Sequence, residues 1–163
     1  MKKSLIIGII VVIFIICIAF VIGVAFTNYN KERTSITSEE FKLIMENKEF
    51  FMIDATSQNT ENEYIKKVYN AVESDNRYQI EFYEYTDSDI ANKFYKNMYS
   101  KLESGKGKAY SRTNINLKNY SKYTLTAKGR YTILSRINNT IMYVSVSDEY
   151  KDDVKGIIEE LGY

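Results

Sequence analysis

The stretch YTLTAKGRYTILSRINNTIMYVSV, residues 123–146, decides the fold, because apolar and polar residues alternate along it between short turn signals. A period of two is typical of half-buried β-strands. Asn138 and Asn139 interrupt the alternation, and asparagine tolerates the left-handed backbone that tight hairpin turns require. The stretch therefore predicts antiparallel strands that are joined by short turns.

A two-residue turn at 138–139 sets the register of the last hairpin. It places Tyr131 opposite Val146 and Ile133 opposite Val144, so both strands present apolar side chains on the same side. This agreement supports the turn, because a slip of one residue would move one of the two sets to the other side.

The preceding hairpin is predicted to have a three-residue loop at 127–129, with Gly129 in the left-handed conformation. This loop places Leu125 opposite Tyr131, on the apolar side, whereas a two-residue loop would reverse the faces of the earlier strand. With one apolar face, the expected architecture is an α+β domain, in which a mainly antiparallel sheet has helices packed on one face.

Helices are predicted on both flanks of this strand region. Three capping-box patterns open predicted helices: Thr37 with Glu40, Thr60 with Glu63, and Thr86 with Asp89. The helix after Thr86 has the clearest apolar stripe, at Ile90, Phe94, Met98 and Leu102. The pattern also predicts helices over 64–72 and 150–161, and short strands over 50–53 and 78–82.

An uninterrupted apolar run at residues 5–26 precedes the domain, and its 22 residues would form a helix of about 33 Å, enough to cross a bilayer. Lys2 and Lys3 place residues 1–4 in the cytoplasm by the positive-inside tendency. Residues 27–36 are then a tether and 37–163 an extracytoplasmic domain of a single-pass cell-membrane protein. Cleavage of a signal peptide near Ala25 is the alternative.

Composition excludes several kinds of chemistry. The chain has no histidine, and its only cysteine, Cys17, lies in the apolar run, which removes His- and Cys-dependent catalysis and zinc sites. We therefore predict no cofactor and no metal. The favoured function is a binding or accessory module at the bacterial envelope. An envelope enzyme with an unrecognised Ser/Lys or carboxylate site and a subunit of a membrane complex are the alternatives.

Charge is segregated along the domain. Residues 101–136 carry nine basic side chains and one acidic side chain, whereas the segments on both sides are acidic. In the predicted register, five basic residues point away from the helices and form an anion-binding face: Arg112, Lys118, Lys122, Arg130 and Arg136. Its expected partners are anionic lipid headgroups, wall polymers or an acidic protein, and the predicted topology makes nucleic acid unlikely. The alternative is an ordinary solvent-facing sheet surface.

Overall fold

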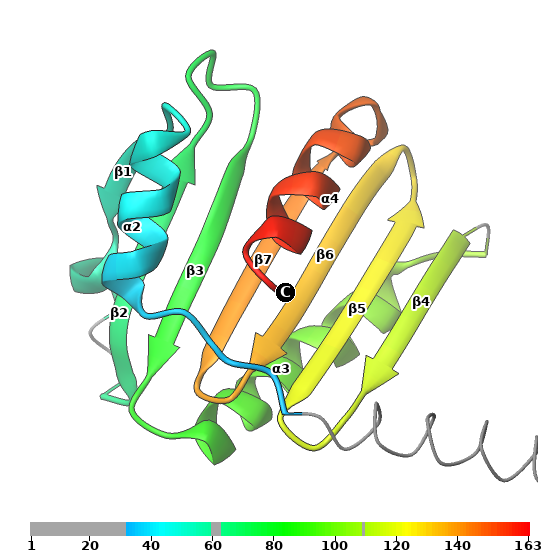
Figure 1. Cartoon of the computed structure of the whole chain (residues 1–163). Helices are drawn as coiled ribbons and strands as arrows, with labels where there is room; N and C mark the ends of the chain where they lie inside the picture. The colour runs from blue at the N-terminus through cyan, green and yellow to red at the C-terminus, as the bar shows by residue number, and fades with distance from the viewer. Residues whose placement is uncertain (1–31, 60–62, 109) are drawn as a thin grey trace, which may run out of the picture. The chain divides into compact units, whose positions relative to one another are not determined.

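A seven-stranded sheet, with strand order β1-β2-β3-β7-β6-β5-β4, forms the centre of the domain (Figure 1). The computed structural model describes residues 32–59, 63–108 and 110–163. The strands are β1 Phe51–Asp54, β2 Ile65–Val72, β3 Gln79–Tyr85, β4 Tyr110–Asn116, β5 Tyr120–Ala127, β6 Arg130–Ile137 and β7 Thr140–Ser147. Every pair of neighbours is antiparallel, which confirms the predicted α+β class and the antiparallel sheet.

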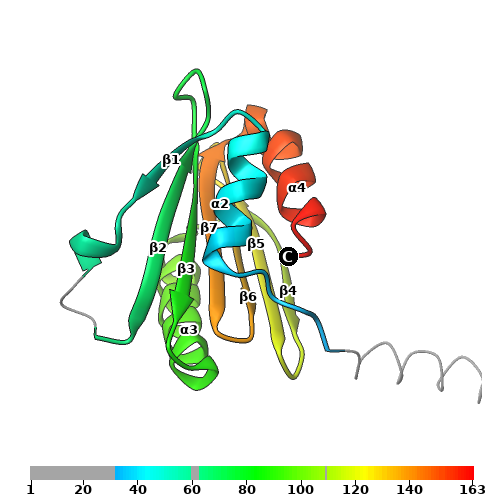
Figure 2. The same ribbon diagram turned by 60° about the vertical axis from the view of Figure 1, so that its left-hand side comes forward.

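Helices cover both faces of this sheet. The described helices are α2 Ser38–Asn47, α3 Ser88–Gly105 and α4 Lys151–Glu160, with short 3-10 turns η1 Thr56–Asn59 and η2 Asp148–Tyr150. Figure 1 shows α2 and α4 in front of the sheet and α3 behind it, and Figure 2 shows the same layers from the side. The prediction that helices pack on one face only is therefore wrong.

Two separate apolar cores follow from this arrangement. Ile133 of β6 belongs to the core under α2 and α4, whereas its neighbour Leu134 belongs to the core under α3. All side chains from Tyr131 to Ile137 are buried, including the polar ones. Because both sides of the central strands are covered, the polar residues between the apolar ones do not mark a solvent face.

The β6–β7 hairpin has the predicted register. Tyr131 lies opposite Val146 and Ile133 lies opposite Val144. Asn138 has a φ of 49°, the left-handed conformation that was the reason for placing the turn there. The prediction for this hairpin is confirmed.

The β5–β6 hairpin corrects the second register. Its turn has two residues, Lys128 with a φ of 53° and Gly129 with a φ of 72°, as expected for a type I′ turn. Leu125 therefore lies opposite Thr132, one residue away from the predicted partner. The prediction failed because it required one apolar face, and Leu125 is instead buried in the core under α3.

The predicted starts of two helices are close to the observed ones. The Thr37–Glu40 capping box is present, since the Thr37 N–H donates to the Glu40 carboxylate at 2.7 Å and the Glu40 N–H donates to Thr37 Oγ1 at 3.2 Å. Helix α3 begins one residue later than the pattern implies. Asp87, rather than Thr86, is its N-cap and accepts from the Asp89 N–H at 2.6 Å.

The helix predicted over 64–72 is wrong, because these residues form strand β2, Ile65–Val72. Thr60 of the second capping box lies outside the described residues. Strand β2 lies between β1 and β3, and the consecutive residues Val68 and Tyr69 are both buried. Apolar residues at both even and odd positions produce a spacing that resembles a helical stripe.

The compact unit begins at Arg33, four residues before the predicted domain start. The Arg33 N–H donates to Asn119 Oδ1 at 3.1 Å, and its guanidinium lies 3.6 Å from the centre of the Tyr120 ring. The last part of the predicted tether is therefore attached to the domain. The predicted anchor, 5–26, lies outside the described residues, and no helix in the part that is described is long and apolar enough to span a membrane.

Candidate ligand-binding pocket

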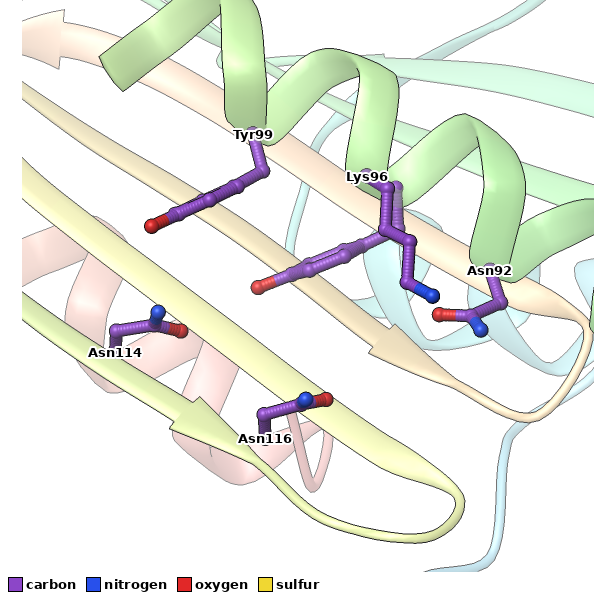
Figure 3. A pocket seen from close by; sticks show the side chains of 6 residues that line it. Asn92, Lys96, Tyr99, Asn114 and Asn116 are labelled. Carbon is purple, nitrogen blue, oxygen red and sulfur yellow. The ribbon is translucent and has the colours of Figure 1, made fainter.

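A pocket lies between helix α3 and the edge strand β4, with a volume of about 170 Å³. Its lining residues are Asn92, Tyr95, Lys96 and Tyr99 from α3 and Asn114 and Asn116 from β4. Figure 3 shows the labelled side chains of the helix and of the strand facing one another across this space. The pocket therefore brings together two segments that are joined by the loop after α3.

Local geometry explains why these side chains converge. The helical residues are spaced by three and four positions, so they share one side of α3. Asn114 and Asn116 are two positions apart, so they share one side of β4. Asn114 lies opposite Tyr123, whose side chain belongs to the core under α3, and this register turns both asparagines toward the helix.

Tyr95 is the unusual residue of the pocket. Its side chain is only 5% exposed, and its hydroxyl has no hydrogen-bond partner. Burial raises the pKa of this hydroxyl above its ordinary value, so the group is neutral and offers both a donor and an acceptor. A buried polar group without a partner costs about 1 to 3 kcal/mol.

Arg136 lies on β6 close enough to Tyr95 for the two groups to influence each other's pKa. Its guanidinium donates to the Asn138 carbonyl at 3.1 Å and to Ser121 Oγ at 3.5 Å, but its Nε has no partner. Burial lowers the pKa of this guanidinium, while Tyr95 and Asp89 act in the opposite direction. Arg136 forms no ion pair with any carboxylate in the described part of the chain, which is unusual for a charge that is 4% exposed.

Ser121 connects this buried charge with the pocket wall. Its hydroxyl donates to Asn116 Oδ1 at 2.9 Å and accepts from Arg136. The amide of Asn116 is thereby oriented with its NH₂ group still able to donate.

Glu103 lies further along α3 and connects this helix to strand β4. Its carboxylate accepts from the Tyr123 hydroxyl at 2.6 Å and from Lys106 Nζ at 2.5 Å, and it pairs with Arg112 of β4 at 2.6 Å. These contacts, led by that with Lys106, lower the pKa of Glu103 to about 2. Glu103 therefore joins β4 to α3 along the same side of the helix as the pocket.

The five basic residues that were predicted to share a surface do not share one. Arg112, Arg130 and Arg136 lie on the α3 side of the sheet, Lys122 lies on the side of α2 and α4, and Lys118 lies in the turn between β4 and β5. The predicted common face is wrong because it depended on the three-residue loop and on helices covering only one side.

Protein contacts already engage several of these five side chains. Arg130 donates to Ser145 Oγ at 3.1 Å, and the half-buried Lys122 donates to the main-chain oxygen of Tyr163 at 2.9 Å. Arg136 is the member of the set that contacts the wall of the pocket through Ser121. Anion binding by the set stays a prediction.

The residues that line the pocket are not among those predicted from the sequence. Asn92, Tyr95, Lys96 and Tyr99 form a polar row beside the apolar stripe of α3, and this spacing is visible in the sequence. Nothing in the sequence indicates that β4 would lie alongside that row, because the contact depends on the crossover between the two elements.

A second pocket lies on the other side of α3, with a volume of about 310 Å³. Its lining residues are Gln58, Asn59, Ile65, Tyr83, Tyr85, Phe94 and Met98. Neither pocket is lined by serine or by a carboxylate, the groups that a hydrolytic site would need. Among the described residues, no group of three or more His, Cys, Asp or Glu side chains is placed to hold a metal ion.

Comparisons of the chain with known proteins found no similar protein. No protein-family model, no curated protein and no solved structure matches the chain.

Proposed function

We propose that this chain is a binding module that is held at the cell membrane by residues 5–26 and takes a small polar ligand in the pocket between α3 and β4. The observation that carries the proposal is the Tyr95 hydroxyl, which lies buried at this pocket without a partner. Sites for small ligands usually combine apolar rings with a few convergent polar groups, and Tyr95, Tyr99 and the asparagines supply both.

The other polar groups of the pocket are also available. Within the described residues, no hydrogen bond or ion pair engages the side chains of Asn92, Lys96 or Asn114. A ligand would therefore meet groups that do not first have to break protein contacts, and this lowers the cost of binding.

A thermal-unfolding screen of the full chain in an uncharged detergent tests the proposal. The panel contains neutral sugars, carboxylic acids, amino acids and phosphorylated polyols. We expect one class to raise the melting temperature of the wild type, because a ligand at 100 times its Kd stabilises the folded state by about 2.7 kcal/mol. Lys96→Ala should lose this increase.

Lys93→Ala is the matched control, since Lys93 is exposed on the same helix and does not line the pocket. It should keep the wild-type response. An increase that is the same in wild type and Lys96→Ala would place the ligand elsewhere, and no increase with any class would contradict the proposed function.

A further inference from the structure

The pocket combines positive charge with an absence of carboxylates in its lining. Lys96 contributes an ammonium group to the lining. Arg136 is a buried guanidinium that is linked to the pocket wall through Ser121 and Asn116, and its Nε has no partner. Asp89 lies near enough to act on Arg136 electrostatically, but it forms no ion pair with it and does not line the pocket. The lining therefore carries one positive side chain and no negative one, which favours an anionic group.

The amides of the pocket require more than a charge from the ligand. Asn92 and Asn114 each offer a carbonyl oxygen and an NH₂ group, whereas Asn116 offers its NH₂ group because its oxygen already accepts from Ser121. A hydroxyl is the group that both donates to an amide oxygen and accepts from an NH₂ group. A bare anion would accept from these amides but leave their oxygens unmatched. An uncharged sugar would leave the positive charge unmatched.

Size limits the ligand to a small group. A volume of about 170 Å³ corresponds to about five or six water molecules in the liquid. A short polyol with one phosphate fits this space when part of it lies at the open mouth, where Lys96 is exposed. Lysine is a frequent phosphate ligand because its ammonium acts as a compact point charge.

We propose that the pocket between α3 and β4 binds a phosphorylated polyol, with the phosphate at Lys96 and the hydroxyls at the three asparagines and Tyr95. This inference rests on the proposed function and names its ligand class. The same chemistry occurs in a dissolved polyol phosphate and in a glycerol phospholipid headgroup, and the experiment separates these sources.

The probe is glycerol 2-phosphate, titrated into the full chain in an uncharged detergent by isothermal calorimetry. Glycerol and inorganic phosphate are the two partial ligands, one without the charge and the other without the hydroxyls. We expect the Kd of glycerol 2-phosphate to be at least about tenfold lower than that of either partial ligand, because each half of the site adds contacts.

Variants test the phosphate contact and the hydroxyl contacts separately. Lys96→Ala should weaken glycerol 2-phosphate about tenfold and leave glycerol unchanged, since it removes the charged contact only. Asn114→Ala should remove most of the preference of the pocket for glycerol 2-phosphate over inorganic phosphate. Lys93→Ala and Asn97→Ala, which change exposed residues of the same helix outside the pocket lining, should behave as wild type.

Nanodiscs distinguish the sources. The full chain is placed in discs of phosphatidylcholine or of phosphatidylglycerol, and glycerol 2-phosphate is titrated into both. Weaker binding in phosphatidylglycerol discs means that the headgroup competes for the pocket, and equal binding means that the ligand comes from solution. Either result is compatible with the proposal, provided that Lys96→Ala weakens binding in both discs.

Other outcomes would overturn the inference. If a neutral sugar or a simple carboxylate binds more tightly than glycerol 2-phosphate and loses affinity in Lys96→Ala, the ligand class is wrong although the proposed binding function stands. If inorganic phosphate binds as tightly as glycerol 2-phosphate, the polyol part is wrong. If no compound binds, the ligand class and the proposed function both fail.

Discussion

Tyr95 shows how one side chain links stability with binding. Its hydroxyl is buried without a partner, so Tyr95→Phe removes an unsatisfied group and keeps the ring that packs in the core under α3. We expect this variant to be more stable than wild type by about 1 kcal/mol, which is an increase of about 3 to 5 °C in melting temperature. Thermal unfolding of the two full chains without added ligand measures it.

Tyr163→Phe is the comparison for this prediction. The Tyr163 hydroxyl is also buried, but it is hydrogen-bonded to Thr140 Oγ1. Removing it should destabilise the domain by about 1 kcal/mol. A loss of stability in Tyr95→Phe as well would show that the Tyr95 hydroxyl has a partner, and the main support for the pocket would disappear.

Glu103 makes the stability of the domain depend on pH in the acid range. Its pKa is about 2 in the folded protein, lowered first by Lys106 and then by Tyr123 and Arg112, against an ordinary value of 4.5. A lowered folded-state pKa contributes stability that is fully present above pH 4.5 and is lost as the pH falls toward 2. Chemical unfolding of wild type and Glu103→Gln at pH 7, 4.5 and 3 tests this.

Glu103→Gln should be less stable than wild type at pH 7, and the difference should shrink at pH 3. Glu159→Gln, an exposed change on α4, should follow the wild-type curve. A difference between wild type and Glu103→Gln that is constant with pH would mean that the charge of Glu103 is not what stabilises the contact with β4.

At the scale of elements, β6 is the strand that most clearly has two buried sides. Ile133 and Leu134 are both 0% exposed, and they contact different cores. We expect Ile133→Asp and Leu134→Asp each to unfold the domain, because an unpaired buried carboxylate costs several kcal/mol and domains have only about 5 to 15 kcal/mol of stability. Circular dichroism of the purified variants measures the effect.

Thr113→Asp is the control, since Thr113 is exposed on the edge strand β4. It should fold as the wild type does. A sheet with helices on one face would tolerate one of the two β6 substitutions, so a folded Leu134→Asp would contradict the position of α3.

The β5–β6 turn is the other element whose geometry can be tested. Gly129 has a φ of 72° and no heavy atom within 4 Å of an added Cβ, so Gly129→Ala introduces backbone strain without a clash. We expect a loss of about 1 kcal/mol, measured by urea unfolding. Gly105→Ala, also in open space but in a helical position, should cost nothing or stabilise slightly. Equal effects would argue against the two-residue turn.

At the scale of the whole molecule, the predicted anchor can be tested directly. We expect the full chain to stay with the membrane after an alkaline wash, and the domain to be degraded by protease added to cells without their wall. This follows from the apolar run at 5–26 and from Lys2 and Lys3 before it. Protection from protease would contradict the outward orientation. Release of a fragment that begins near residue 26 would show cleavage instead of anchoring.

The sequence alone determined the features that depend on neighbouring residues. The antiparallel class, the Thr37–Glu40 capping box and the register of the β6–β7 hairpin follow from local patterns, because turns, caps and the alternation of strands involve residues close in the chain. The apolar run at 5–26 has the same local character, and its function as an anchor is still a prediction.

Only the tertiary structure decided which sides of the sheet are buried and where the site lies. Both depend on the path of α3, which crosses behind the sheet and then faces β4 (Figure 1). Once α3 covers the second face, Leu125 is a core residue, Arg136 is buried, and the predicted basic face is divided between the two sides. The pocket arises where side chains of one helix meet those of the strand that follows it, a contact between elements that no local pattern encodes.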